Sequence, residues 1–246
     1  MKINMFFQPL EQFEIFFLGK IGGLTITNST IYLMILSFVI FFLFSMVFLQ
    51  SRLIPYNLQI LVEEIYNFVF GLVKQQMNTK GYAYFPLIFS LFLFILIANI
   101  IGMCLYSFTL TSHIVIAFAL SFSMFMGIVI IGILIQKLAF INTFVPAGAP
   151  KALTPFLIGI EIISYFSRPF SLGIRLFANL MSGHTLLAIL ANFAFLISKK
   201  SFIIFLLPFL LITAIVGLEI MIAMLQAYVF TVLVCIYLND SLVGSH

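Results

Sequence analysis

The chain has 246 residues, of which 64% are hydrophobic and 7% are charged, with a mean hydropathy of +1.28 and a formal net charge of +4. An ordinary globular domain carries about 25% charged residues. The composition therefore excludes a soluble globular protein and predicts a single all-α membrane domain over residues 1–246 that crosses the bilayer several times. The eleven cations are spread over many loops, which excludes the basic patch of a nucleic-acid-binding protein.

The first part of the chain predicts one spanning helix and one surface helix. Gly22-Gly23 and the polar run from Thr25 to Ser29 indicate a loop, and residues 30–49 are apolar over the length of one span. Residues 55–77 have one apolar and one polar face, which is typical of an amphipathic helix lying along the membrane surface. Docking of this helix on a soluble partner is the alternative.

The rest of the chain predicts two hairpins. Residues 85–106 and 113–136 form two ordinary spans, and residues 155–197 and 202–238 form two unusually long apolar segments. The first long segment would measure about 64 Å as one helix, against a hydrocarbon core of about 30 Å. We therefore expect a continuous, steeply tilted pair. A break at Pro169 or Gly183 is the alternative.

The orientation of the chain in the membrane is indicated only by a small difference in the number of cations on its two sides. Five cations follow the first and fourth predicted helices and four lie on the other side, so the positive-inside rule places the N-terminus outside. Glu11 and Glu14 and the absence of a basic, Ser-rich amphipathic start argue against a transit peptide. Cys104 and Cys235 lie in separate apolar runs and are interpreted as small buried hydrophobic residues.

A polar stripe on the first long segment is the main functional signal. Its members recur every three or four residues and fall within a sector of roughly 80° on a helical wheel. An Arg at the bilayer centre costs at least ~2.5–3.5 kcal/mol on insertion scales, so a wet path or a charged partner should follow this face. Snorkelling to an interface is the alternative for Arg168 and Arg175. The stripe comprises Glu161, Ser164, Arg168, Ser171, Arg175, Asn179 and Ser182.

Proton affinity separates the possible roles of the charged residues. Arg175 stays protonated at any biological pH, so it can act as a fixed charge but not as a relay. Glu219, with Gln226 on the same helical face, and His184 can exchange protons, so we expect the acid and the imidazole to approach each other across the last two helices. A structural hydrogen bond is the alternative for His184. Because acids are scarce, a carboxylate on another polypeptide is expected opposite the arginines.

Other membrane functions find no support in the sequence. Only His184 among the three histidines falls inside a span, so the axial ligands of a haem protein are missing. No Gly-rich phosphate loop follows a strand, so no nucleotide site is expected, and no cofactor or metal is implied. No internal repeat indicates an inverted-repeat transporter.

Two motifs resemble subunit a of F-type ATP synthase. They are SLGIRLFANLMSGH at residues 171–184 and GLEIMIAMLQAYVFTVL at residues 217–233. The opening PLEQFEI at residues 9–15 resembles mitochondrial members, and the order of elements agrees along nearly the whole chain. The resemblance implies a stator subunit, not an enzyme by itself, which carries protons through two half-channels to and from a ring of c subunits. It also implies a complex with further membrane-sector subunits in the mitochondrial inner membrane, or in a bacterial inner membrane as the alternative.

The resemblance also implies roles for individual residues. Arg175 matches the essential arginine that faces the ring carboxylate, and Glu219 with His184 matches the acid–histidine pair of the half-channel open to the intermembrane space. Further polar positions match the two half-channels: Asn179, Gln226 and, less closely, Asn99 on that side, and Glu161 and Asp240 on the matrix side. Arg168 matches a basic position of some members, without an assigned role.

A self-contained secondary transporter is the other hypothesis. In that case Arg175 would bind an anionic substrate, and the chain would work alone in liposomes, whereas a stator subunit needs its ring. The residues leave open whether the transported ion is a proton or sodium. The sequence shows no cluster of oxygen ligands of the kind that binds sodium, which favours protons.

Overall fold

The structure, a computed structural model, describes residues 13–21, 24–49, 55–103, 109–137, 154–198 and 202–243. These residues form mainly α-helices and confirm the prediction of an all-α polytopic membrane protein. Every α-helix except α2 is long and apolar enough to cross a membrane. The helices are α1 (Asn28–Leu49), α2 (Asn57–Met77), α3 (Phe85–Gly102), α4 (Ile114–Gln136), α5 (Thr154–Ser198) and α6 (Phe202–Val243), with 3-10 helices η2 (Asn78–Tyr84) and η3 (Leu110–Ser112).

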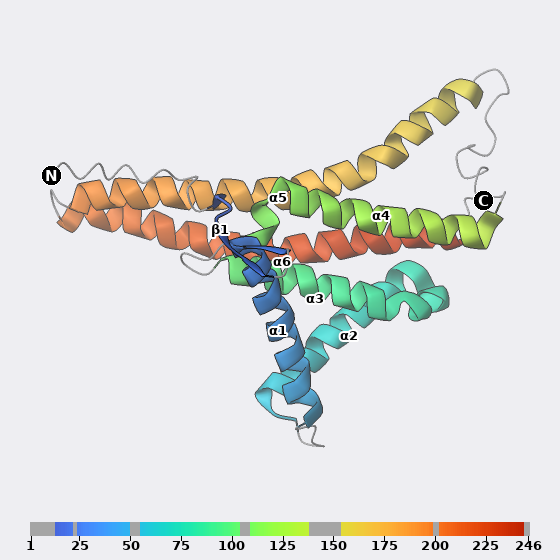
Figure 1. The fold of residues 1–246 in the computed structure, drawn as a ribbon, viewed down its shortest axis with the longest axis horizontal. Helices are drawn as coiled ribbons and strands as arrows, with labels where there is room; N and C mark the ends of the chain where they lie inside the picture. Colours follow the sequence, from blue (N-terminus) through green and yellow to red (C-terminus); the bar gives the residue numbers. More distant parts are fainter. Residues whose placement is uncertain are drawn as a thin grey trace.

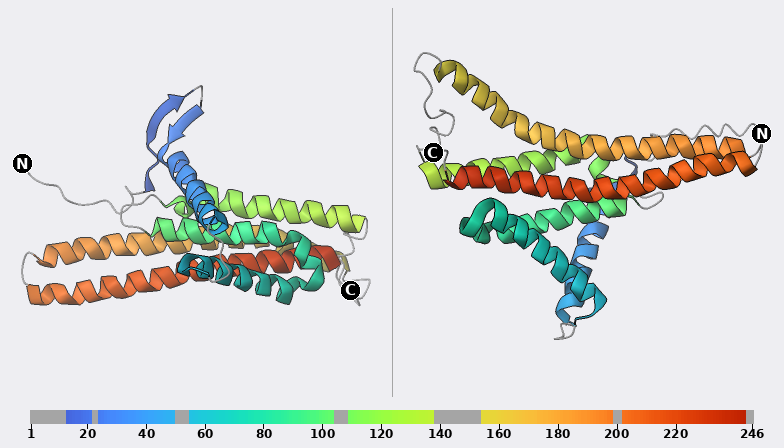
Figure 2. Two further views of the ribbon diagram at one scale, coloured as in Figure 1. Left: turned by 90° about the horizontal axis from the view of Figure 1, so that it is seen from below. Right: turned by 180° about the vertical axis from the view of Figure 1, so that it is seen from behind.

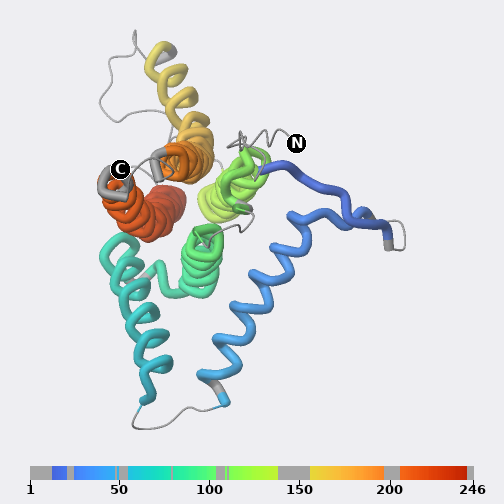
Figure 3. The backbone as a smooth tube through the Cα atoms, turned by 90° about the vertical axis from the view of Figure 1, so that its left-hand side faces the viewer, coloured from blue at the N-terminus to red at the C-terminus, as the bar shows by residue number. Residues whose placement is uncertain are grey.

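Four helices form a bundle with roughly parallel axes (Figures 1 and 3). Helix α6 lies at its centre, with α5 and α4 on one side and α3 and the end of α2 on the other. The core is aliphatic and aromatic, and its fully buried members include Ile88, Ile95, Leu176, Phe230 and Val234. The later part of α6 is buried in this core, whereas apolar residues of its first part, such as Leu207 (69% exposed) and Leu210 (61% exposed), face outwards, as lipid-facing positions do.

Helices α5 and α6 are each continuous, as the sequence predicts. They contain 45 and 42 residues, respectively, with Pro169 inside α5 and Pro208 inside α6. At 1.5 Å per residue, α5 is about 67 Å long and α6 about 63 Å. Helix α5 is bent: its first part leaves the bundle, and the rest runs beside α6 (Figures 1 and 2). A proline removes one backbone hydrogen bond and bends a helix without ending it, provided that the packing supports it. The tilt in the membrane stays a prediction.

Helices α1 and α2 lie outside the bundle over much of their length. Helix α1 leaves it obliquely (Figure 3), and Leu36 is its buried residue, packed with Ala98 of α3. Helix α2 buries the last part of its apolar face, including Val69, Val73 and Met77, while Leu61 in its first part is 53% exposed. The bundle thus covers the apolar face of α2 only at the C-terminal end of this helix.

A short hairpin precedes α1 and corrects the prediction of a loop from Thr25 to Ser29. Strand β1 (Phe17–Ile21) pairs antiparallel with β2 (Leu24–Thr27), and α1 begins directly afterwards, at Asn28. β-Branched residues in this run favour the extended conformation. The hydroxyl of Thr30 donates to the carbonyl of Thr27 and accepts from its amide, which fixes the start of the helix. Gly22 and Gly23, at the predicted loop, lie outside the described residues.

Gly173 allows α4 and α5 to approach each other closely. A Cβ atom there would lie 2.8 Å from Oγ of Ser121 and 3.4 Å from Cα of Phe118, both on α4. We expect Gly173→Val to force the helices apart and to lower the stability of the protein by about 1–3 kcal/mol, as overpacking does elsewhere. The midpoint of thermal unfolding of the purified protein measures the effect.

Gly159→Val is the matched control for this prediction. It makes the same change on the same helix, where a Cβ atom would meet nothing within 4 Å. Equal unfolding midpoints for the two variants would contradict the proposed close packing of α4 on α5.

Candidate proton-transfer site

Arg175 lies on the exposed face of the central part of α5. Its neighbours in the helix Leu172 and Leu176 are buried in the bundle, whereas Arg175 itself is exposed. Among the described residues it makes no ion pair and no hydrogen bond. Within the described part of the chain, this exposed arginine therefore carries a positive charge without an ion-pair partner.

One side-chain hydrogen bond joins α5 to α6 one turn beyond Arg175. The amide of Asn179 donates to Oε1 of Gln226 over 3.1 Å. Gln226 is 3% exposed, and its own amide nitrogen has no hydrogen-bond partner among the described residues. This pair brings together two of the polar residues predicted for the pathway.

Glu219 is a buried carboxyl group without a hydrogen-bonding partner in the described protein. It is 8% exposed, and neither of its carboxylate oxygens accepts a hydrogen bond there. The side chain lies against α5 at Gly183, where an added Cβ atom would be 2.5 Å from Oε1. Gly183 therefore leaves the space that the carboxyl group occupies. Sequence reasoning considered this glycine only as a possible helix break.

His184 follows Gly183 directly and is half-buried. Its Nε2 atom has no hydrogen-bond partner among the described residues, and the ring of Phe13 lies edge-on to it with centroids 6.4 Å apart. The structure thus brings His184 and Glu219 to the same part of the α5–α6 contact, without a direct hydrogen bond from Nε2. Buried polar atoms in proteins are normally paired with protein groups or water, so this cluster is a natural position for water or exchanging protons.

Asn99 forms part of a buried network next to this region. Its amide donates to the carbonyl of Ala223, which lies between Glu219 and Gln226 on α6, over 3.2 Å. Its carbonyl accepts from the hydroxyl of Thr111 over 3.1 Å. Asn99 thus connects α3, η3 and α6, which agrees with the helix–helix hydrogen bond expected for a lone Asn in a span.

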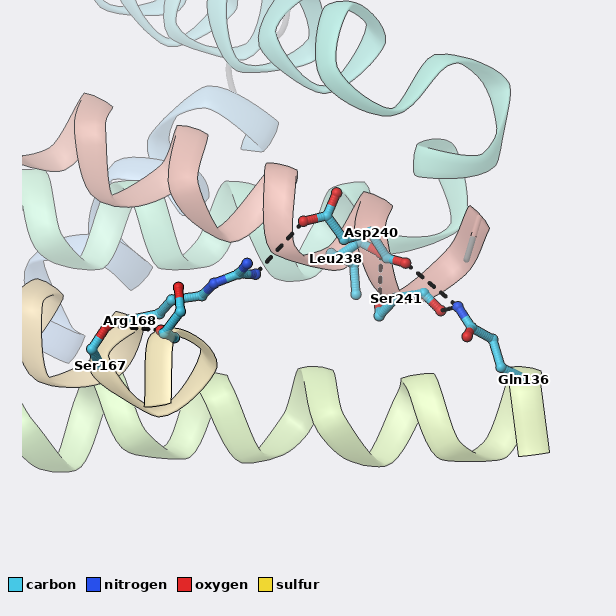
Figure 4. Close-up of polar contacts among 7 residues, drawn as sticks. Gln136, Ser167, Arg168, Leu238, Asp240 and Ser241 are labelled. Atoms are coloured by element: carbon cyan, nitrogen blue, oxygen red, sulfur yellow. Dashed lines mark hydrogen bonds and ion pairs between the residues drawn. The ribbon is translucent and has the colours of Figure 1, made fainter. Parts of the chain in front are cut away.

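A second polar cluster lies farther along α5 and α6 (Figure 4). Nη1 of Arg168 is 3.6 Å from Oδ2 of Asp240, and its guanidinium lies over the rings of Tyr165 and Tyr237 at 5.2 and 4.7 Å. Arg168 therefore has its partners inside the chain. Glu161, two turns earlier, is half-buried and makes no ion pair with the described residues.

Helix α6 continues past residue 238, where the sequence analysis ended it, so that Asp240 lies inside the helix. Polar contacts explain the extension. The amide of Gln136, at the end of α4, donates to the carbonyl of Ser241 over 2.6 Å and to that of Asp240 over 3.4 Å, and the hydroxyl of Ser241 donates to the carbonyl of Leu238. The two bonds from Gln136 satisfy carbonyl groups in the last turn of α6, which a helix end leaves free.

Arg175 lies between the two polar clusters along the α5–α6 pair. The helices run antiparallel, with Arg168 facing Asp240 on one side of Arg175 and Asn179 facing Gln226 on the other. Glu219 and Asp240 are separated by about 32 Å along α6, at 1.5 Å per residue. Each polar cluster thus contains an acid, and the permanently charged Arg175 lies between the two clusters.

Comparison with known proteins identifies the family. Residues 30–239 match the ATP synthase A chain family. The chain is 48% identical to ATP synthase subunit a of Acanthamoeba castellanii over 98% of this chain and 100% of the relative, and 48% identical to that of Chondrus crispus over 95% of both. It is 41% identical to subunit a of Pelagibacter ubique over 95% of this chain and 97% of the relative. The chain therefore belongs to the ATP synthase subunit a family.

Proposed function

We propose that this chain is the stator proton channel of the ATP synthase membrane sector. It takes protons through one half-channel to the carboxylates of a rotating c ring and releases them through a second half-channel. Its family places it in the proton-translocating membrane sector, as a multi-pass subunit that is not itself catalytic. The relatives come from eukaryotes and a bacterium. With the opening motif, we favour the mitochondrial inner membrane.

The observation that carries this proposal is that Arg175 is exposed and forms no ion pair with the described residues. A guanidinium cannot release its proton, and a charge facing lipid costs several kcal/mol unless an anion compensates it. Within the described residues Arg175 has no anion, so a carboxylate of another polypeptide is the natural partner. A passing ring carboxylate would meet that need, and the positive charge would favour its ionised form and so release its proton.

The two acidic clusters supply the two half-channels. On one side, Glu219 and His184 form a proton-exchanging pair, with Asn179 and Gln226 leading toward Arg175. On the other side, Asp240 and Glu161 provide acids nearer the matrix. Because Arg175 lies between these clusters and cannot relay a proton, a proton crosses from one half-channel to the other only on the moving ring. Proton flow is thereby coupled to rotation.

Replacing the central arginine tests this function. We expect Arg175→Ala to abolish proton-driven ATP synthesis while the complex still assembles, because the side chain makes no hydrogen bond or ion pair within the described chain. Protons should also leak without rotation when the charge barrier is lost. Synthesis and passive proton conduction by the purified complex in liposomes measure both effects.

Ser182→Ala is the control for the arginine variant. Ser182 is exposed on the same stripe, and its hydroxyl donates to the carbonyl of Asn179 in its own helix. We expect this change to leave coupling intact. A normal rate of synthesis in Arg175→Ala would refute the assignment.

Gly183→Ala tests the position of the proposed relay acid. The new Cβ atom would lie 2.5 Å from Oε1 and 3.0 Å from Cδ of Glu219, so the flexible carboxyl group must turn away. The helices need not move, and we expect normal assembly with proton conduction lowered about tenfold or more, since misplacing a reacting group by about 1 Å can cost 10²-fold. Gly217→Ala, two residues before Glu219, is the control because its Cβ atom would meet nothing within 4 Å. Equal conduction by the two variants would contradict the prediction.

A further inference from the structure

Residues 13–16, which directly precede strand β1, bring an aromatic ring to His184. The ring of Phe13 lies edge-on to the imidazole, with centroids 6.4 Å apart and ring planes inclined at 77°. Aromatic rings prefer this edge-to-face arrangement to a face-to-face sandwich. Phe13 and His184 are far apart in the sequence, so the contact joins the early part of the chain to the contact between α5 and α6.

The imidazole of His184 has no polar group that holds its Nε2 atom. This atom has no hydrogen-bond partner in the described part of the chain. A hydrogen bond to one ring nitrogen normally determines which tautomer a His ring adopts. Where such a bond is missing, the packing of neighbouring side chains holds the ring. Phe13 supplies the aromatic part of that packing.

Asn28 holds the segment that carries Phe13. The side-chain amide of Asn28 donates to the carbonyl of Glu14 over 3.0 Å, and its side-chain oxygen accepts from the backbone amide of Phe16 over 3.3 Å. The backbone amide of Asn28 also donates to the carbonyl of Phe16 over 3.2 Å. Asn28 is the first residue of α1, so these three bonds fix residues 14–16, and with them the adjacent Phe13, to the start of this helix.

Phe13 is the aromatic residue of this region that turns toward the bundle. It is half-buried, whereas Phe16 and Phe17 are 55% and 58% exposed, on a hairpin that projects away from the bundle (Figure 2). Helices α5 and α6 share the main core and are held together without this segment. The contact of Phe13 therefore acts on the orientation of the imidazole and not on the position of the helices.

We propose that Phe13 is a positioning residue for His184. Asn28 fixes residues 14–16 to the start of α1, and the ring of Phe13 then holds the imidazole in the orientation in which it exchanges protons at the α5–α6 contact. This inference rests on the proposed role of His184 in the half-channel that contains Glu219. It gives an apolar residue outside the long helices a part in proton transfer.

Proton conduction per assembled complex in liposomes tests the role of the ring. We expect Phe13→Ala to lower it about threefold or more, within the range that one aromatic pair contributes. Phe13→Tyr keeps the ring and should retain most of the rate. Asn28→Ala removes both side-chain bonds to the segment and should also lower the rate. Phe17→Ala is the matched control, because it removes the same side chain at an exposed position, and it should conduct normally.

Nuclear magnetic resonance signals of the His184 ring give a readout that does not depend on activity. Only this chain of the assembled complex carries labelled histidine, and the signals of His184 are identified by their loss in His184→Gln. Phe13→Ala should shift these signals, because the neighbouring ring is gone, and Phe17→Ala should leave them in place. Unchanged His184 signals in Phe13→Ala would overturn the proposal.

A purely structural role predicts a different pattern. Phe13→Ala would then reduce the amount of assembled complex and leave conduction per complex unchanged, and that result also overturns the proposal. If Phe13→Ala does not assemble, Phe13→Leu takes its place in both measurements, because it keeps an apolar side chain and removes the ring. The same loss of conduction and the same shift of the His184 signals are then expected, and the absence of either contradicts the positioning role.

The two proposals fail separately. An active Arg175→Ala complex would refute the stator function, whatever Phe13 does. An inactive Arg175→Ala complex, combined with normal conduction per complex in Phe13→Ala, would refute only the positioning role.

Discussion

The need to compensate a permanent charge within the membrane is the constraint on which the rest of this structure depends. In lipid, backbone N–H and C=O groups must form hydrogen bonds within the protein, as they do in helices. Ionised side chains require oppositely charged partners or water. The two arginines of α5 meet this need differently. Arg168 has a carboxylate and two aromatic rings from its own chain, whereas Arg175 stands exposed without an ion pair among the described residues. Arg175 is therefore the residue for which we propose a carboxylate on another subunit as the partner.

The α5–α6 pair makes this difference possible. Two long antiparallel helices keep the same faces together over many turns, so cross-links such as Asn179–Gln226 and Arg168–Asp240 lie at fixed positions along one contact. Small residues at that contact decide which side chains fit, as Gly183 does for the carboxyl group of Glu219. Helix α3 holds the opposite side of α6 through the amide of Asn99.

Much of this arrangement can be predicted from the sequence because it is periodic and local. Apolar runs predict the helices, and the polar stripe that keeps its phase across Pro169 predicts a continuous α5. The same reasoning identifies Arg175, Glu219 and His184 as candidates, since charged residues are so rare in the spans. It missed the β1–β2 hairpin, whose strands are too short to give a clear alternation.

Side-chain contacts between different helices cannot be predicted from the sequence in this way. Periodicity shows which face of a helix a residue occupies, but not which helix lies opposite or in what register. Arg168 and Asp240 are far apart in the sequence, and the cation–π contact with Tyr237 leaves no local pattern. The same holds for Gln136, which supports the last turn of α6 from another helix.

The sparse contact of α1 has a consequence for the distribution of stability over the chain. Helices α3 to α6 share one core, whereas α1 buries little more than Leu36 against α3. Cooperative folding units follow buried contacts, so α1 should separate from the bundle at a small fraction of the free energy needed to open α6. We therefore expect the angle of α1 to the bundle to be fixed less firmly than the packing of α3 to α6, so that the proposed site in the bundle stays in place when α1 moves.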